Sequence, residues 1–372
     1  QIVLSYLDMM TKRGASDFYF TKGAPPTLRI DDHLVQADEE ILDDDALHAI
    51  LGCLLTTRQK RSFDQECELN TALDMGEYGR FRLNVMSQRQ SPALVIRRII
   101  TTIPGFDELH LPDIMQDIAM AKRGLVLVTG MTGSGKTTSL AAMVDYRNRN
   151  MPGHIVTIED PIEYFHIHKK SVITQREVGI DTQSYAIALQ NALRQRPDVI
   201  LCGEAREREV MEQVLSIADT GHLCLSTMHT NNASQAIERI VNMFSEDRQG
   251  QIRLSLSLNL NAIIGQRLVP DTDGNMVAAV EVLLNQGVIK DYIQEGRIHK
   301  IPEIMEQNYA QGMCTFDQSL IALFVQGRIT EETAVAQADI TGDVKTRIQK
   351  IKLGQEDEGL KGIDTSLLKI ME

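Results

Sequence analysis

The sequence has few of the residues that cross-link or anchor a protein. It carries five cysteines in 372 residues, and no two of them form a CxxC pair; they are Cys53, Cys67, Cys202, Cys224 and Cys314. Neither a disulfide framework nor a zinc site is therefore expected, and we predict that the cysteines are reduced, buried, small apolar residues. No apolar run is long enough to span a membrane and no signal peptide is visible, so we expect residence in the cytoplasm.

Positive charge is also scarce. The chain has 38 lysines and arginines against 51 aspartates and glutamates, which gives a formal net charge of −13. This balance argues against broad electrostatic attraction to nucleic acid or to an anionic membrane, although it leaves room for a local basic groove. The length favours two domains, and 43% apolar with 24% charged residues is ordinary for a soluble globular protein.

The hydrophobic pattern changes character near residue 103. Before that point it predicts short helices and strands: an amphipathic helix over residues 2–10, and a half-buried antiparallel strand over residues 80–85 with Phe81, Leu83 and Val85 on one face. Residues 103–112 carry the prolines and glycine of a connector. We therefore expect an α+β domain over 1–103, a linker over 104–117, an α/β domain over 118–350 and a tail over 351–372.

The second region contains near-continuous apolar runs that are typical of a parallel sheet covered by helices. These runs lie at residues 125–128, 155–158, 199–201 and 223–225. Polar or charged residues follow each run. Because ligands of open α/β sheets bind at the carboxyl ends of the strands, these polar residues are expected to converge on one site.

A complete phosphate-binding loop follows the first of these runs. Residues 130–137 read GMTGSGKT, in which glycines let backbone N–H groups face phosphate oxygens, Lys136 reaches the β and γ phosphates, and the Thr137 hydroxyl can ligate Mg²⁺. An incidental glycine turn is the weaker alternative. The residues expected to bind the nucleotide here are Gly130, Thr132, Gly133, Ser134, Gly135, Lys136, Thr137 and Thr138.

Carboxylates and histidines follow the other apolar runs. Residues 159–163 read EDPIE, and a hydrolase needs such a carboxylate to activate water, although a solvated acidic turn is an equal alternative. Glu204 stands where a carboxylate could hold Mg²⁺, with a helix N-cap as the alternative. His222 and His229 bracket the last run. Satisfied structural histidines are common, but we interpret this pair as sensors of the γ-phosphate.

The four motifs GMTGSGKTT, IEDPIEY, CGEAR and TGHLCLSTMHTNNA, in this order and spacing, resemble those of the secretion ATPases. These are hexameric motors of type II secretion, type IV secretion and type IV pili. The segments 14–17, 80–82 and 313–320 narrow the resemblance to the PilT/PilU family of pilus retraction ATPases. The resemblance extends from about residue 1 to 350 and implies a PAS-like α+β domain followed by a RecA-like P-loop NTPase domain with a mainly parallel sheet and a helical C-terminal part.

The resemblance also implies roles for individual residues. Glu163 would activate water, Glu204 would support Mg²⁺, and His222 and His229 would sense the γ-phosphate of ATP. Arginines at the positions of Arg80 and Arg82 reach nucleotide across a subunit boundary in the family, with a solvated strand face as the alternative. The implied partners are five further copies in a hexamer, a pilus platform protein in the inner membrane, at whose cytoplasmic face the ring would work, and a paralogous retraction ATPase.

The chain departs from the PilT pattern at Arg196, Ala205, Glu207 and the pair Asn231–Asn232, and the run 255–270 is more similar to the PilU side of the family. We therefore predict an ATP-hydrolysing motor that powers pilus retraction as a companion of the main retraction ATPase. An accessory ring with little turnover of its own is the alternative. A nucleic-acid translocase is disfavoured by the negative charge, and an extension or secretion motor by the lack of a four-cysteine module. The tail could form a short helix around Ile363 and Leu367, although a frayed surface tail is favoured.

Overall fold

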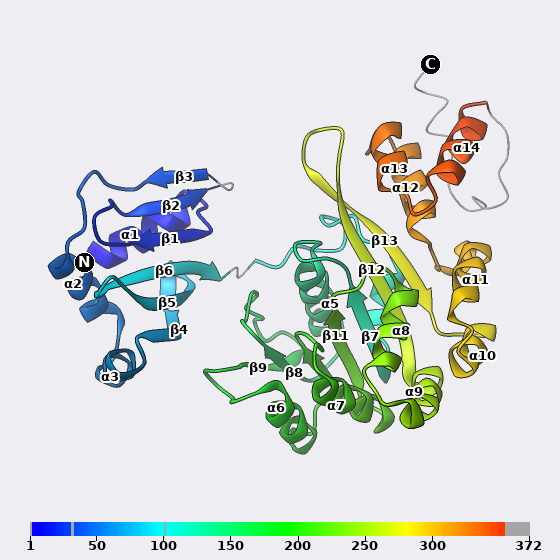
Figure 1. The fold of residues 1–372 in the computed structure, drawn as a ribbon, viewed down its shortest axis with the longest axis horizontal. Helices are drawn as coiled ribbons and strands as arrows, with labels where there is room; N and C mark the ends of the chain where they lie inside the picture. Colours follow the sequence, from blue (N-terminus) through cyan, green and yellow to red (C-terminus); the bar gives the residue numbers. More distant parts are fainter. Residues whose placement is uncertain (1, 31–32, 100–101, 354–372) are drawn as a thin grey trace. The chain divides into compact units, whose positions relative to one another are not determined.

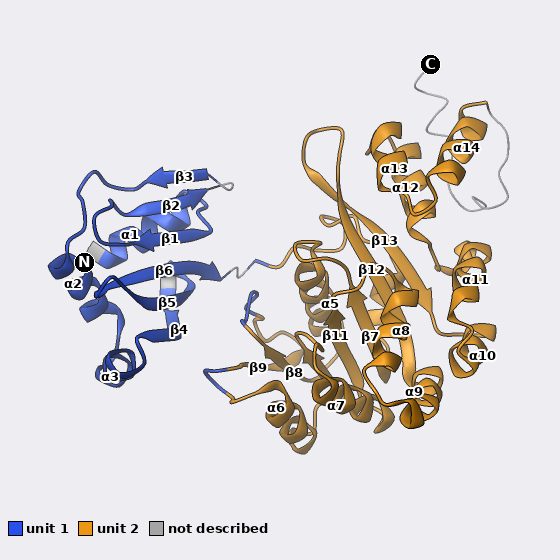
Figure 2. Cartoon of the chain, viewed as in Figure 1, with its two compact units in different colours: residues 1–102, 161–165, 179–181 blue, residues 103–160, 166–178, 182–372 orange. Residues whose placement is uncertain are grey.

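The computed structural model describes residues 2–30, 33–99 and 102–353, which form two compact units (Figures 1 and 2). The first unit comprises residues 1–102 together with the short segments 161–165 and 179–181. The second comprises residues 103–160, 166–178 and 182–372. Each unit has a sheet and a core of its own, and we describe them separately.

The first unit is an antiparallel sheet with helices packed on it. The strand order is β3-β2-β1-β6-β5-β4, and β5 pairs with both β4 and β6. The alternation predicted for residues 80–85 is confirmed, because Phe81, Leu83 and Val85 are fully buried. The elements are α1 (Ile2–Lys12), β1 (Asp17–Phe20), β2 (Thr27–Ile30), β3 (His33–Gln36), α2 (Asp44–Leu54), α3 (Thr57–Glu66), β4 (Glu68–Asp74), a 3-10 turn (Gly76–Tyr78), β5 (Arg80–Gln88) and β6 (Ser91–Ile99).

The second unit contains a mainly parallel sheet in the order β13-β12-β7-β11-β10-β8-β9. Strands β9, β8, β10, β11, β7 and β12 run parallel, and β13 returns antiparallel to β12. The four predicted strands are confirmed as the centre of this sheet. The strands are β7 (Gly124–Thr129), β8 (Gly153–Glu159), β9 (Ser171–Glu177), β10 (Val199–Cys202), β11 (Leu223–Met228), β12 (Leu260–Pro270) and β13 (Met276–Leu284).

Apolar residues on both faces of the central strands explain why the sheet is covered on both sides. On β7, Leu125 and Leu127 pack in one core layer with α6–α11, whereas Val126 and Val128 pack in the other with α4 and α5. The helices of this unit are α4 (Ile114–Ala119), α5 (Lys136–Asn150), α6 (Tyr185–Ala192), α7 (Arg208–Asp219), α8 (Ala233–Asn242), α9 (Glu246–Asn259), α10 (Val288–Glu295), α11 (Ile301–Gln307), α12 (Phe316–Val325), α13 (Glu331–Gln337) and α14 (Thr341–Lys352), with 3-10 turns at Leu193–Gln195, Ile298–Lys300 and Tyr309–Gln311.

The segment expected to be a linker over 104–117 is part of the second core. Phe106, Leu111 and Met115 are buried there, and α4 begins inside the segment. Pro104 and Gly105 directly precede Phe106, and Pro112 directly follows Leu111. Residues 103–117 therefore belong to the fold of the second unit.

The C-terminal helices α12, α13 and α14 pack with one another beyond the sheet and share a separate apolar cluster with the ends of β12 and β13 (Figure 1). The predicted tail helix around Ile363 and Leu367 lies outside the described residues. Among the residues that the structure describes, no helix is long and apolar enough to cross a membrane. The cysteine prediction is partly wrong: Cys202 and Cys224 are buried, but Cys53 of α2 and Cys67, the residue directly after α3, are exposed.

Candidate functional site

The phosphate-binding loop connects the carboxyl end of β7 to the amino end of α5. Its glycines are required by the backbone, since Gly130, Gly133 and Gly135 all have positive φ. The side chain of Lys136 is buried, and its ammonium group donates to the carbonyl oxygens of Gly130 and Met131, each at 2.8 Å. The lysine charge is therefore held inside the loop, beside the N–H groups at the start of a helix, which is the arrangement that phosphate anions bind.

The loop rests on Gln266 of β12, a residue that the motifs did not single out as part of the site. A Cβ atom on Gly130 would lie 2.4 Å from the Gln266 carbonyl oxygen, and one on Gly135 would lie 2.8 Å from its Nε2. The Gln266 Oε1 also accepts a hydrogen bond from Ser139 Oγ of α5 at 2.8 Å. Gln266 thus fixes both the loop and the first turns of the helix, and no local sequence signal connects these distant positions.

A carboxylate and an imidazole meet at the same edge of the sheet. Glu204 follows β10, His229 follows β11, and their Oε1 and Nε2 atoms are 2.8 Å apart. Burial lowers the pKa of His229 below its ordinary value; nearby Lys136 acts in the same direction and Glu204 opposes it. The neutral imidazole therefore carries its hydrogen on Nε2, and this N–H donates a hydrogen bond to the Glu204 carboxylate, because a carboxylate can only accept.

Glu204 is not a helix N-cap. The helix α7 begins at Arg208 with Glu207 as its capping position, and the Glu204 carboxylate also pairs with the Nε of Arg206. The two strand ends are joined by hydrogen bonds from Thr227 Oγ1 to the Gly203 carbonyl oxygen and from the Ala205 N–H to the Thr227 carbonyl oxygen. Glu204 is therefore held at the sheet edge with its carboxylate turned to His229.

Arg239 of α8 is a second residue that the motifs missed. Its Nη1 donates to the His229 carbonyl oxygen at 2.9 Å, and it lines a pocket of about 320 Å³ with Thr132, Glu204, Ala205, Arg206, Met228 and His229. The pocket joins the phosphate-binding loop to the Glu204–His229 pair. Oxygen ligands and cations that face one cavity beside such a loop are suited to a nucleotide phosphate with its metal ion. Arg239 lies ten positions beyond His229 in the chain, so only the fold brings it here.

His222, predicted as a γ-phosphate sensor, does not lie in this cluster. It precedes β11, whereas the phosphate-binding loop follows the parallel neighbour β7. The His222 carbonyl oxygen accepts from the N–H of Gly124, the first residue of β7, and its Nδ1 lies 3.0 Å from Thr220 Oγ1. A strand of this length separates the two edges of the sheet by roughly 20 Å at about 3.3 Å per residue. His222 therefore lies at the edge of the sheet opposite the phosphate-binding loop.

The remaining predicted residues stay predictions. Glu163 is exposed in the irregular segment between β8 and β9, in the part of it that groups with the first unit. Arg80 and Arg82 lie on β5 of the first unit, half-buried, with Arg80 Nε 3.7 Å from Asp74 Oδ2. The half-buried Thr137 and Thr138 start α5 as expected, and Thr132 and Gly133 are exposed on the loop.

Comparisons with known proteins fit this geometry. Residues 4–341 match the family described as Type II/IV secretion system protein. The chain belongs to this family. Among its relatives in Pseudomonas aeruginosa, the type IV pilus ATPase PilU is 46% identical over 95% of this chain and 92% of its own length. The type IV pilus retractation ATPase PilT of the same organism is 36% identical over 91% of this chain and 98% of its own length.

Within the Type II/IV secretion system family, the chain belongs to the PilT/PilU group of type IV pilus ATPases. A crystal structure of the pilus retraction motor PilT with bound ADP superposes with a TM-score of 0.86 at 39% identity, covering 92% of this chain and 98% of that one. This agreement confirms the predicted fold class, an N-terminal α+β domain followed by a RecA-like ATPase domain.

Proposed function

We propose that this chain is the ATP-hydrolysing subunit of a hexameric ring that powers type IV pilus retraction, as a PilU-like companion of a paralogous retraction ATPase. The observation that carries the proposal is the meeting of the Lys136 loop, Glu204, His229 and Arg239 at one edge of the parallel sheet. The similarity to PilU and PilT supports the choice of pilus retraction over other motor functions.

In this proposal, Lys136 and the glycine loop bind the phosphates of ATP. The Thr137 hydroxyl and the Glu204 carboxylate are oxygen ligands of the kind that Mg²⁺ prefers, so they fit a magnesium ion between loop and sheet edge. Such an ion neutralises charge on the phosphates when it is bound. Glu163 accepts the proton of the attacking water. His229 reports the γ-phosphate by moving its Nε2–H hydrogen bond from the Glu204 carboxylate to a phosphate oxygen.

The ring would depend on residues of more than one subunit. Arg80 and Arg82 of one subunit would reach the nucleotide of a neighbour, so that ATP turnover changes the angle between subunits. Such a change could drive a platform protein of the inner membrane, with the ring at its cytoplasmic face. The net charge of −13 gives no support to nucleic acid as a partner.

The proposal is tested by steady-state ATP hydrolysis as a function of protein concentration, with Glu163→Gln as the key variant. This substitution keeps size and removes the base, so we expect nucleotide affinity to remain while turnover falls by about 10³-fold or more. Lys136→Ala should weaken both nucleotide affinity and turnover. Turnover should rise cooperatively with concentration if the ring is the active form.

Two results would contradict parts of the proposal. Unchanged turnover in Glu163→Gln would remove Glu163 as the base. Tight ATP binding by the unsubstituted protein, with turnover no higher than in Glu163→Gln, would favour the accessory ring that regulates another retraction ATPase.

A further inference from the structure

The segment that carries Glu163 leaves the sheet at the end of β8 and returns to it at the start of β9. Its first end is fixed by strand pairing, since Glu159 is in register with Glu177 of β9. The other end, residues 166–170, which we call the return arm, belongs to no strand or helix. Its backbone must therefore be held by something other than the sheet.

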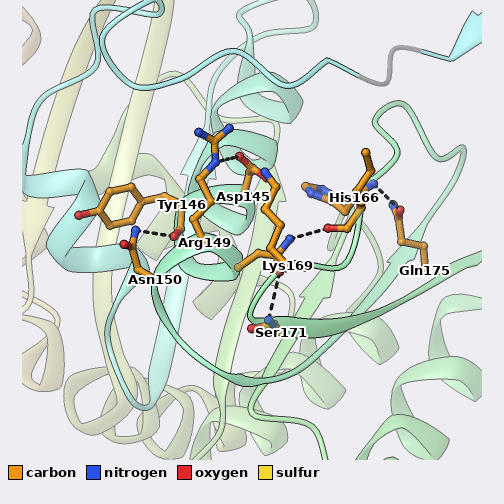
Figure 3. A network of polar contacts seen from close by, with 10 residues as sticks. Asp145, Tyr146, Arg149, Asn150, His166, Lys169, Ser171 and Gln175 are labelled. Carbon is orange, nitrogen blue, oxygen red and sulfur yellow. Dashed lines mark hydrogen bonds and ion pairs between the residues drawn. The ribbon is translucent and has the colours of Figure 1, made fainter.

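Gln175 of β9 joins the two ends of this segment. Its Nε2 donates to Glu159 Oε1 at 3.2 Å, and its Oε1 accepts from the backbone N–H of His166 at 2.8 Å (Figure 3 shows the second contact). The orientation of the amide is settled by its partners, because a carboxylate needs a donor and an N–H needs an acceptor. One side chain thus closes the base of the segment that presents Glu163.

Asn148 of α5 holds the rest of the return arm. Its side chain is fully buried; Nδ2 donates to the Ile167 carbonyl oxygen at 2.7 Å, and Oδ1 accepts from the N–H groups of Lys169 and Ser171 at 3.1 and 3.2 Å. The Lys169 side chain pairs with the buried Asp145 one turn earlier on α5 (Figure 3). The return arm is therefore tied to the helix that begins at the end of the phosphate-binding loop.

We propose that Gln175 and Asn148 are positioning residues that hold the Glu163 segment in the geometry needed for ATP hydrolysis. The inference rests on the proposed role of Glu163 as the base. A carboxylate that activates water must be placed to within about 1 Å, and a displacement of that size costs on the order of 10²-fold in rate. Gln175 is the sharper test of the two, because it joins both ends of the segment and does not line the pocket beside Glu204.

The first experiment compares Gln175→Met with the unsubstituted full-length protein. Methionine keeps the length of the side chain and removes the hydrogen bonds to Glu159 and His166. We expect kcat for ATP to fall by about 10- to 100-fold, while affinity for a fluorescent ATP analogue changes by no more than about twofold. Val172→Thr, on the same strand and with a side chain that is 59% exposed, is the matched control and should leave both quantities unchanged.

The second experiment exchanges the side chains of Gln175 and Glu159. Gln175→Glu alone places a carboxylate against Glu159 and should lower kcat. The double substitution Gln175→Glu with Glu159→Gln restores a donor–acceptor pair, because residue 175 can then accept from both His166 and the new amide. We expect kcat of the exchanged protein to exceed that of Gln175→Glu by about tenfold. Recovery in the exchanged protein would show that the contact between residues 175 and 159 itself sets kcat, provided that the melting temperatures of the two variants are the same.

The outcomes separate this inference from the proposed function. If Glu163→Gln abolishes turnover but Gln175→Met does not lower kcat, the positioning role alone is wrong. It is also wrong if nucleotide affinity falls as much as kcat, or if the exchange restores nothing. If Glu163→Gln retains turnover, both proposals are overturned. Should Gln175→Met fail to fold, the comparison of the single and exchanged variants decides the matter.

Discussion

At the scale of single residues, Glu281 of β13 is a buried carboxyl group with an unusual environment. Its Oε2 accepts from the Ala233 N–H, the first residue of α8, at 2.6 Å. Burial raises its pKa to about 7; Asp339, Asp317 and the nearby Cys314 thiol also face it, while Arg267 and the Ala233 N–H favour the charged form. Gly265, opposite it on β12, has no room for a side chain, since a Cβ there would lie 2.9 Å from the carboxylate.

Because of this raised pKa, the contribution of Glu281 to the stability of the folded protein decreases as the pH rises. The folded protein holds the Glu281 proton more tightly than the unfolded chain does, so the neutral carboxyl stabilises at low pH and this contribution is lost as pH rises through about 7. Glu281→Gln should therefore raise the melting temperature at pH 8 but not at pH 5, with a gain of roughly 1–3 kcal/mol in the free energy of unfolding.

Thermal melting of the variant at both pH values is the measurement. Glu238→Gln, an exposed glutamate on α8, is the matched control and should change little at either pH. An equal effect of Glu281→Gln at pH 5 and pH 8 would show that folding does not raise the pKa of this carboxyl, and the explanation by burial would be wrong.

At the scale of elements, strand direction places one of the two histidines beside the phosphate-binding loop. His229 follows β11 and pairs with Glu204, whereas His222 precedes the same strand. We expect His229→Ala to lower kcat by about 10²-fold, as for other lost groups at a reacting phosphate. His222→Ala should leave kcat and nucleotide affinity within about twofold once any loss of stability is corrected.

Steady-state kinetics with melting curves for both variants measures this difference. A loss of kcat in His222→Ala as large as that in His229→Ala, in a protein of unchanged stability, would mean that the opposite edge of the sheet takes part in turnover. The interpretation of His222 as a structural residue would then fail.

Part of the fold and of the candidate site could be predicted from the sequence. The central strands were predictable because each is a continuous apolar run, and the phosphate-binding loop because its residues are contiguous. Strand β9 was not predicted, since Gln175, Arg176 and Glu177 interrupt its apolar pattern. Gln266, Arg239 and Gln175 reach their partners only through the fold, and no local pattern marks them. His222 was expected beside His229 because the two histidines bracket one strand, although the two ends of a strand lie at opposite edges of the sheet.

At the scale of the whole molecule, the two units have separate cores, and the Lys136 loop and the Glu204–His229 pair lie in the second. The first unit buries its own apolar residues around Phe18, Phe81 and Leu83, and the second has layers on both faces of its sheet. Nothing in the Lys136 loop or the Glu204–His229 pair requires the first unit. We therefore expect the first unit to contribute to turnover through Arg80 and Arg82 and to contribute little to nucleotide binding.

Mixing two inactive variants tests whether these arginines act on a neighbouring subunit. A protein with Arg80→Ala and Arg82→Ala keeps Lys136, and a protein with Lys136→Ala keeps both arginines, so neither should hydrolyse ATP at more than a small fraction of the normal rate. In a ring with head-to-tail interfaces, roughly a quarter of the interfaces in an equal mixture combine an intact Lys136 with intact arginines from the neighbour. Activity should therefore reappear on mixing if arginines act across the boundary.

The amount of ATPase activity recovered on mixing shows whether the arginines act on a neighbouring subunit or on their own. Recovery to roughly a quarter or less of the unsubstituted rate supports action of the arginines on a neighbouring subunit. The control mixes Lys136→Ala with a chain that carries Lys136→Ala together with both arginine substitutions, and it should show no recovery. No recovery, in mixtures shown by sedimentation to form joint rings, would place the arginines with the nucleotide of their own chain or outside the reaction. The control carries the same substitutions on the same fold, so a difference between the mixtures can only come from pairing one subunit's lysine with another subunit's arginines.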